Sequence, residues 1–392
     1  MAPNQEGRGV PYALEHMSLS RLKRRRRCTR EDWWQVEGAR GGYRDDAPPD
    51  AKAAYALKRL TSLPALVGQL LHTAAASRAR AIRDGRQPFG ADAIWAVIRA
   101  HLNDVVGAQH RARGRPTPER GASAAPILRE VAFGEWPGGR IPPGLAALTA
   151  FNAKAAIQCL IKHPVWAALA ECGRDEILIC DALDAMQFRL ATGLVNIFAA
   201  PDLVWLSRQP QELPRQTVPL IPPVLTVLDW KTGHPRDWGE TERVGLAVYA
   251  WWVMEKQQLP EVPRTVVGWI AGLNPTAPMS DAMVVLSAQD LAVGRDLMLR
   301  EAEQVMAARD QHGVVAMEHT TRNLDACRFC NFSRLCFEGQ DRLAADGIWD
   351  ATQADPAEAR CAPPRPGAGF AGPRSMQGEG SRTDGGVRAH RP

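Results

Sequence analysis

The chain has 392 residues, of which 45% are hydrophobic and 23% charged, and its formal net charge is +5. This composition is typical of a globular chain with one large domain or two ordinary ones. The first thirty residues lack a secretory signal, and the longest apolar run, at 245–254, is far shorter than the roughly 20 residues that span a bilayer. We therefore expect a cytoplasmic protein without a membrane partner.

The N-terminal part of the chain is expected to be helical. Residues 1–16 are predicted to form a loose leader, and Pro64 is expected to start a new helix within its segment. A Gly-, Pro- and Arg-rich stretch at 111–144 has no sustained hydrophobic period, which predicts a flexible insertion. Spacing and capping residues predict helices, in chain order, over 18–36, 50–82, 91–109 and 145–160.

The hydrophobic period changes after these helices, which indicates a sheet. Short β-favouring runs predict strands over 177–179, 191–198, 203–206, 224–228, 265–270 and 282–286. Helical spacing returns at 242–257 and 291–309. Residues 341–392 are poor in large apolar side chains, so we expect a mostly disordered tail. The fold class predicted is α/β, with a mixed central sheet flanked by helices and a helical N-terminal part.

Acidic side chains follow two of the predicted strands. Asp229 and Lys231 are two residues apart at the end of one strand, so both face the same side, while Trp230 points away and offers its backbone carbonyl. Asp202 follows a plausible neighbouring strand. Two carboxylates that converge from adjacent strands form the hard oxygen site that Mg²⁺ or Mn²⁺ prefers.

Three cysteines are spaced as C-x2-C-x5-C at Cys327, Cys330 and Cys336, and a fourth, Cys28, lies almost 300 residues upstream. A thiolate-bound iron–sulfur cluster or zinc ion needs four ligands, so the distant cysteine would clamp the two ends of a domain together. The asymmetric spacing favours iron–sulfur, since structural zinc sites tend to use paired short spacings. The remaining cysteines have no partner at ligand spacing: Cys159, Cys172, Cys180 and Cys361.

These motifs together resemble the PD-(D/E)XK nuclease superfamily. Within it they are similar to the RecB/AddB-type branch with an iron–sulfur cluster and to the related CRISPR-adaptation exonucleases. The resemblance covers roughly residues 17–340 and implies one restriction-endonuclease-like nuclease domain interrupted by 111–144. The matching segments are Gly68-Gln-Leu-Leu-His72, Pro201-Asp202-Leu-Val, Val227-Leu-Asp-Trp-Lys231-Thr-Gly, the Tyr249 helix and the split cysteine set.

The resemblance implies a role for each matching residue. His72, Asp202, Asp229 and the Trp230 carbonyl would hold Mg²⁺ or Mn²⁺, and Mn²⁺ would be well tolerated because one ligand is an imidazole. Lys231 would orient or deprotonate the attacking water and stabilise the charge that develops on the phosphate. Tyr249 would belong to a helix that lines the DNA groove. The cluster cysteines, Cys28, Cys327, Cys330 and Cys336, would ligate [4Fe–4S], with zinc less favoured.

One residue departs from the pattern. The family helix usually reads Gln-x-x-x-Tyr, and this chain has Gly245 in place of the Gln, with Glu242 one turn earlier as a partial substitute at best. The expected function is therefore a metal-dependent DNA nuclease, an exonuclease or DNA-end processor of repair or recombination. The alternative is a catalytically weakened DNA-binding module or helicase partner. The chain lacks the Gly-x-x-x-x-Gly-Lys-Ser/Thr phosphate loop, so any unwinding would come from a partner such as a helicase subunit.

Basic and aromatic side chains gather near Cys28. The run Arg24–Arg27 is by default a solvated helix face, but beside a DNA groove it is expected to contact phosphate. Trp33 and Trp34 are predicted to be packing residues rather than base-stacking ones.

Overall fold

The computed structural model describes most of the chain between residues 15 and 309. The described ranges are 15–112, 126–133, 135–136, 140–210, 220–233, 239–257, 259–274 and 281–309, followed by residues 315, 317, 327, 330–333, 335 and 336. Nearly all of the predicted leader, much of the predicted insertion, Cys361 and the whole predicted tail lie outside the described residues, so these predictions stay predictions.

The N-terminal part is helical as predicted, but its elements are shorter. The backbone of Cys28 is extended (φ −163°, ψ 111°) and ends the first helix, so 18–36 is not one helix. The stretch 50–82 is likewise two helices, and the Ser62 side chain caps the second by accepting from the Ala65 N–H. The elements are α1 (Leu19–Arg27), α2 (Thr29–Trp33), a π-helical turn η1 (Trp34–Gly38), α3 (Pro49–Leu57), α4 (Leu63–Arg83), α5 (Ala91–Ala112), α6 (Arg129–Ala132), α7 (Pro143–Lys162), α8 (Val165–Ala170) and a 3₁₀ turn η3 (Arg174–Glu176).

The strands form a five-stranded mixed sheet and two smaller sheets. The central sheet has the order β10-β9-β8-β7-β4, a three-stranded sheet has the order β1-β6-β5, and β2 pairs with β3. Strands β1, β2, β3 and β5 were not among the predicted strands. Strand β1 begins in the predicted leader, β2 interrupts the predicted helix 50–82, β3 lies in the predicted insertion, and β5 is a partly exposed hairpin arm. The strands are β1 (Glu15–Ser18), β2 (Leu60–Thr61), β3 (Ile127–Leu128), β4 (Ile177–Cys180), β5 (Asp184–Leu190), β6 (Gly193–Ala199), β7 (Leu203–Ser207), β8 (Val224–Lys231), β9 (Thr265–Gly272) and β10 (Ala282–Val285).

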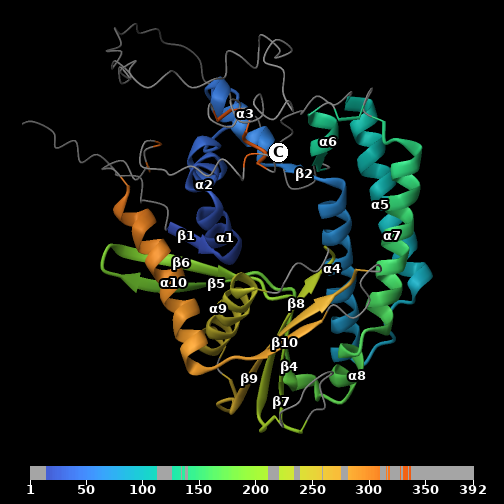
Figure 1. The fold of residues 1–392 in the computed structure, drawn as a ribbon, viewed down its shortest axis with the longest axis vertical. Coiled ribbons are helices and arrows are strands. Elements are labelled where there is room, and N and C mark those ends of the chain that lie inside the picture. The colour runs from blue at the N-terminus through green and yellow to red at the C-terminus, as the bar shows by residue number, and fades with distance from the viewer. Residues whose placement is uncertain are drawn as a thin grey trace, which may run out of the picture.

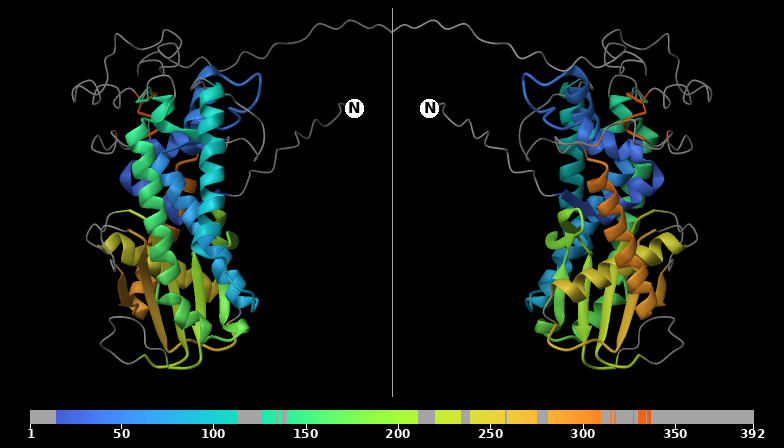
Figure 2. Two further views of the ribbon diagram at one scale, coloured as in Figure 1. Left: turned by 90° about the vertical axis from the view of Figure 1, so that its right-hand side faces the viewer. Right: turned by 90° about the vertical axis from the view of Figure 1, so that its left-hand side faces the viewer.

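Helices cover both faces of the central sheet, as Figure 1 shows. Strands β8 and β9 are parallel, and α9 (Glu240–Lys256) makes the crossover between them. One hydrophobic core joins the sheet to α4, α5, α7 and α8. A second core joins the opposite face to α9, to α10 (Ala288–Ala307) and to the three-stranded sheet. The side views show the strands of the central sheet at one end, with α5 and α7 extending away from them (Figure 2). The predicted α/β class, consistent with a restriction-endonuclease-like fold, is confirmed.

The two ends of the described chain meet in a third hydrophobic cluster. Buried Trp34 and Ala54 pack there with Phe332 and Leu335. Asn331 adds a hydrogen bond from its side-chain amide to the carbonyl of Leu60, at 3.1 Å. In Figure 1 this short C-terminal segment lies beside α2 and α3. The N-terminal helices are therefore closed against residues almost 300 positions away.

Helix α7 corrects one expectation from the sequence. Its segment Pro143–Ile161 has a mean hydropathy of 1.4 and is long and apolar enough to cross a membrane by length and composition alone. Its Gly, Ala and Thr residues hide this property from a search for unbroken runs of large apolar side chains. Ala156, Ile157 and Leu160 pack into the first core, but only 22% of this segment is buried, so most of the helix surface is exposed.

Candidate active site

The end of strand β8 positions the Asp-x-Lys pair. The strand alternates, so that Leu228 and Trp230 enter the first core while Leu225 and Val227 enter the second. Asp229 and Lys231 therefore share the face of Leu225 and Val227. The Trp230 ring points the other way and packs edge-on against buried His163, with ring centroids 4.9 Å apart. This arrangement is the one predicted from the strand period.

Asp202 links strand β8 to helix α4. Its Oδ2 accepts from the Trp230 N–H at 2.7 Å, and its Oδ1 lies 3.0 Å from Nδ1 of His72. Burial raises the pKa of Asp202. For His72, burial lowers the pKa, but the hydrogen bond and charge of Asp202 outweigh it, and the pKa is raised overall. A residue 130 positions away in the sequence is thus held directly against the carboxylate.

Lys231 and Tyr249 complete the group. Lys231 Nζ lies 2.6 Å from Asp229 Oδ2, and both side chains are partly exposed. Burial and then the charges of Asp229 and Asp202 raise the pKa of Tyr249 far above its usual value. Its hydroxyl therefore stays protonated and can only donate its proton in a hydrogen bond or accept one as a neutral group. The structure brings together five side chains from α4, β8, α9 and the loop between β6 and β7: His72, Asp202, Asp229, Lys231 and Tyr249.

Gly68 explains the spacing of the Gly-x-x-x-His segment. A Cβ at this position would lie 2.9 Å from Oγ1 of Thr232, which follows Lys231 directly. Only a glycine lets α4 approach the end of β8 this closely without a shift of Thr232. His72 lies one turn further along α4, on the same side of the helix.

The donor set suits a divalent cation, but its groups are paired with one another. Within the described ranges, no group of three or more His, Cys, Asp or Glu side chains is arranged to hold a metal ion. The carboxylates are instead paired within the protein. Both oxygens of Asp202 accept or share hydrogen bonds, and Asp229 forms an ion pair with Lys231. One imidazole and two carboxylates at a strand end nevertheless match the ligands that Mg²⁺ and Mn²⁺ accept.

The four predicted cluster cysteines lie in the region where the two chain ends meet. Burial raises the pKa of Cys330, and the charges of Glu31, Cys28 and Cys336 raise it further, so these groups lie within electrostatic reach of one another. The N–H of Cys330 donates to the carbonyl of Cys327 at 3.2 Å. Within the described part of the chain these cysteines are not arranged as a ligand set, so the clamp stays a prediction.

The arginines of α1 mostly form ion pairs within the protein. Arg24 Nε and Arg25 Nε lie 3.0 Å from Asp32 Oδ1 and Glu301 Oε2, respectively, and Arg27 pairs with Glu31. Buried Arg21 is held by Glu15 and Asp32. The predicted contact of this run with phosphate stays a prediction, and three of the four arginines of Arg24–Arg27 already have carboxylate partners.

Two side chains near the site were missed by sequence reasoning. Burial and the charge of Lys231 lower the pKa of Lys23 on α1, whereas the charges of Asp229 and Glu242 raise it. His163 places Nε2 3.1 Å from Asp281 Oδ2, and Asp281 accepts from the Gly272 N–H at 2.9 Å, which braces the strand beside Lys231. Neither residue stands in a motif. In the sequence, only the replacement of the family Gln by Gly245 could have suggested that another side chain lies at this place.

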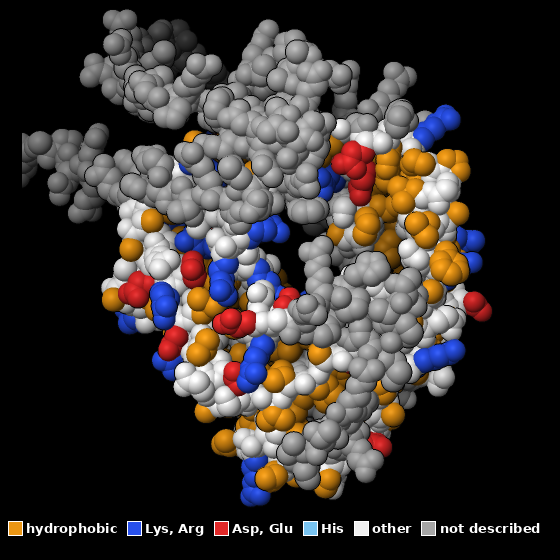
Figure 3. Space-filling view, viewed as in Figure 1, with side chains coloured by type: hydrophobic (Ala, Val, Ile, Leu, Met, Phe, Trp, Pro, Cys, Tyr) orange, Lys and Arg blue, Asp and Glu red, His pale blue; other side chains and the backbone are white. Residues whose placement is uncertain are grey.

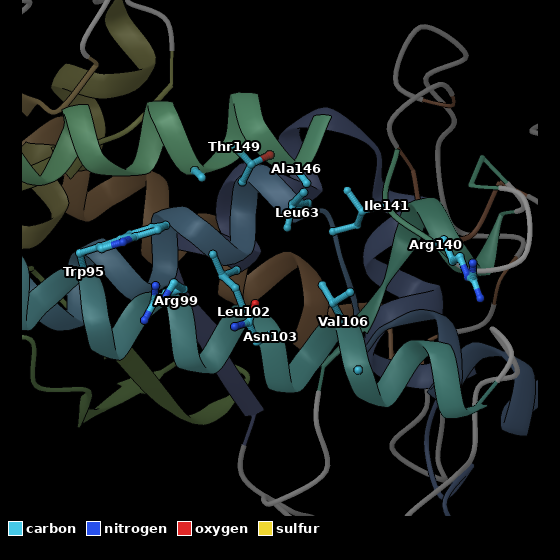
Figure 4. A pocket seen from close by; sticks show the side chains of 12 residues that line it. Leu63, Trp95, Arg99, Leu102, Asn103, Val106, Arg140, Ile141, Ala146 and Thr149 are labelled. Carbon is cyan, nitrogen blue, oxygen red and sulfur yellow. The ribbon is translucent and has the colours of Figure 1, made fainter. Parts of the chain in front are cut away.

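A cavity lies apart from the residues of the candidate active site. It has a volume of about 740 Å³ and lies between the start of α4, α5 and α7, as Figure 4 shows. Its walls include Trp95, Leu102, Val106 and Ile141, with Arg99 and Arg140 among the few charged side chains. It contains none of the groups that converge at the end of β8.

The comparisons with known proteins agree with this geometry. Residues 223–337 match the family described as the PD-(D/E)XK nuclease superfamily, a span that includes Asp229, Lys231 and Tyr249 but not His72 or Asp202. No curated protein matches the chain. A solved structure described as "Crystal structure of SSO0001" is 12% identical over 50% of this chain and 76% of the other, with a TM-score of 0.25, which is too low to indicate a shared fold. The chain thus contains a PD-(D/E)XK nuclease superfamily domain at residues 223–337.

Proposed function

We propose that this protein is a divalent-metal-dependent DNA nuclease that acts on DNA ends, as an exonuclease or end processor in repair or recombination in the cytoplasm. The single observation that carries the proposal is the convergence of His72, Asp202, Asp229 and Lys231 at the end of β8. Residues that serve only the fold would not need to bring two carboxylates, an imidazole and an ammonium to one partly exposed place.

The side chains divide the chemistry between them. His72, Asp202, Asp229 and the Trp230 carbonyl would hold the cation, which supplies a Lewis acid for the phosphate and lowers the pKa of water when bound. Lys231 orients the attacking water and stabilises negative charge on the phosphate being cut. Tyr249, kept neutral by its raised pKa, can donate a hydrogen bond to the substrate.

A [4Fe–4S] cluster at Cys28, Cys327, Cys330 and Cys336 is proposed as a structural staple of the two chain ends. The proximity of Cys28, Cys330 and Cys336 supports it. Four thiolates would supply the ligands of such a cluster, and zinc would be the alternative occupant. Iron content and the visible absorption spectrum of anaerobically purified protein distinguish the two, and Cys28→Ser should lose the metal.

The test of the activity is cleavage of end-labelled single- and double-stranded DNA with Mn²⁺ and with Mg²⁺. Wild-type protein should degrade the DNA, and the ladder of products gives the polarity. Asp229→Ala and Lys231→Ala should each lower the cleavage rate by at least about 100-fold while the protein stays folded, as removal of a transition-state donor does. Unchanged cleavage by Lys231→Ala would refute the catalytic assignment.

The second candidate is a DNA-binding module that has lost catalysis or that partners a helicase subunit. The specific observation in its favour is Gly245, which leaves the position of the family Gln without a side chain. In the same assay this candidate predicts that wild type and Asp229→Ala bind DNA alike and that neither cuts it.

A further inference from the structure

Lys23 differs from the arginines around it on helix α1. Arg21, Arg24, Arg25 and Arg27 all pair with carboxylates. Across the ranges that the structure describes, Lys23 forms no ion pair and no hydrogen bond, although its side chain is only partly exposed. A partly desolvated ammonium without a partner is costly unless an anion binds to it.

The ammonium of Lys23 fills the space beside Gly245. A Cβ at Gly245 would lie 3.4 Å from Lys23 Nζ and 3.6 Å from Lys23 Cε. A longer side chain at position 245 that extends in this direction would meet the end of the Lys23 side chain and compete with it for the same space. The Lys23 side chain on α1 can lie against α9 because Gly245 has no side chain.

The Lys23 ammonium interacts electrostatically with charged residues of the candidate active site. Burial and the charge of Lys231 lower the pKa of Lys23, whereas Asp229 and Glu242 raise it. Two ammonium groups, from α1 and from β8, therefore act on the same carboxylate, Asp229. An anionic substrate at this place would be attracted by both cations.

A hollow lies beside Lys23. Its volume is about 330 Å³, and it lies between α1 and α9, with Lys23, Arg26, Arg27 and Thr241 in its walls. Figure 3 shows several Lys and Arg side chains, with Asp and Glu side chains among them, over this part of the molecule. Acidic side chains are absent from the described walls of the hollow.

We propose that Lys23 and this hollow bind a backbone phosphate of the DNA strand next to the phosphate that is cut, with Lys23 in the space that a side chain at position 245 would fill. The inference rests on the proposed nuclease function and adds a substrate-binding residue to it. In this proposal Gly245 leaves the room that Lys23 needs to reach the phosphate, so the glycine does not indicate lost activity.

A purely structural role for Lys23 is the competing explanation, and a matched pair of variants separates the two. Lys23→Met keeps most of the side-chain volume and removes the charge. Lys256→Met removes the same charge near the other end of α9, about 16 Å along the helix from Gly245 at 1.5 Å per residue. If Lys23 only fills space, Lys23→Met should behave like wild type.

The experiment measures binding of a labelled single-stranded oligonucleotide in Ca²⁺ at several salt concentrations, followed by KM and kcat in Mn²⁺. Lys23→Met should raise Kd by about tenfold, as loss of a hydrogen bond to a charged group does. The slope of log Kd against log salt should fall by about 0.7, the value for one phosphate contact on a single strand. KM should rise more than kcat falls, and Lys256→Met should match wild type.

A second comparison tests the shared space. Gly245→Gln should weaken binding in the wild-type background because the new side chain displaces the Lys23 ammonium. In the Lys23→Ala background the same Gln has room, so it should restore part of the lost cleavage. Strictly additive effects of the two substitutions would overturn the proposed sharing of space.

The outcomes separate the inference from the function on which it rests. If wild type cuts DNA and Lys231→Ala does not, but Lys23→Met keeps the wild-type Kd and salt slope, the Lys23 inference alone is wrong. If wild type neither binds nor cuts DNA, the proposed function fails first. Equal melting temperatures of Lys23→Met and wild type establish that any change in Kd is not a loss of folding.

Discussion

Truncation of Phe332 tests how the two chain ends are held together. The Phe332 side chain is 1% exposed and packs in the cluster that contains Trp34, Ala54 and Leu335. Phe→Ala in a packed core costs about 3–5 kcal/mol. Among the described residues this cluster has six buried members, whereas the two cores around the central sheet are much larger. The loss should therefore release the C-terminal segment and leave the sheet folded.

The assay uses the thiol of Cys330 as a reporter of this local opening. In metal-free protein Cys330 is buried and its pKa is raised, so it should alkylate slowly at pH 8. If alkylation requires opening of the segment, a loss of about 3–5 kcal/mol should raise its rate by roughly 100- to 4,000-fold, since about 1.4 kcal/mol is a factor of ten. Mass spectrometry of the peptide that contains Cys330 measures the rate.

Phe151→Ala is the matched control, because this Phe is 67% exposed on α7 and should lose almost nothing. Hydrogen exchange of the β8 and β9 peptides should stay at the wild-type level in both variants. An unchanged alkylation rate in Phe332→Ala would refute the reasoning. So would a global loss of protection in the sheet, because it would mean that the cluster does not open separately.

Two further predictions concern pH and packing. Because the pKa of His72 is raised in the folded state, its stabilising effect is complete below about pH 6.5 and is lost as pH rises through the folded value. In EDTA, the difference in unfolding free energy between wild type and His72→Ala should therefore shrink from pH 6 to pH 8, whereas affinity for Mn²⁺ should rise with pH because the ion competes with the proton; a difference that grows with pH would contradict this. At Gly294 a Cβ would lie 3.0 Å from the backbone nitrogen of Val248, so Gly294→Ala should destabilise by about 1–3 kcal/mol in urea unfolding. Gly144→Ala has open space around it and should be neutral, so equal effects of the two substitutions would show that the contact is unimportant.

Local patterns were enough to predict much of the fold. The strand 224–228 was predicted from its β-favouring residues, and its period of two placed Asp229 and Lys231 on one face, where the structure has them. The helix that contains Tyr249 followed from its spacing in the same way. These features depend on residues a few positions apart, and the chain geometry of a strand or helix relates such residues directly.

Some local backbone features were harder to predict, because contacts with other elements determine them. The extended backbone at Cys28 interrupts what the sequence indicates as one helix and separates α1 from α2, and no helix-breaking residue marks this position. Strand β5 has no fully buried residue and alternates exposed with half-buried side chains, so it acquires its structure from pairing with β6. Tertiary contacts override weak local preference in both cases.

The sequence by itself determined the α/β class, the Asp-x-Lys pair, and the set of residues from which a metal and a cluster site could be built. Only the tertiary structure decided which of them meet. His72 reaches Asp202 across 130 residues, Lys23 fills the space beside Gly245, and Cys28 lies near Cys330. The physical reason is that each of these contacts depends on how whole helices pack on the sheet, and the spacing of residues along the chain carries no direct measure of that packing.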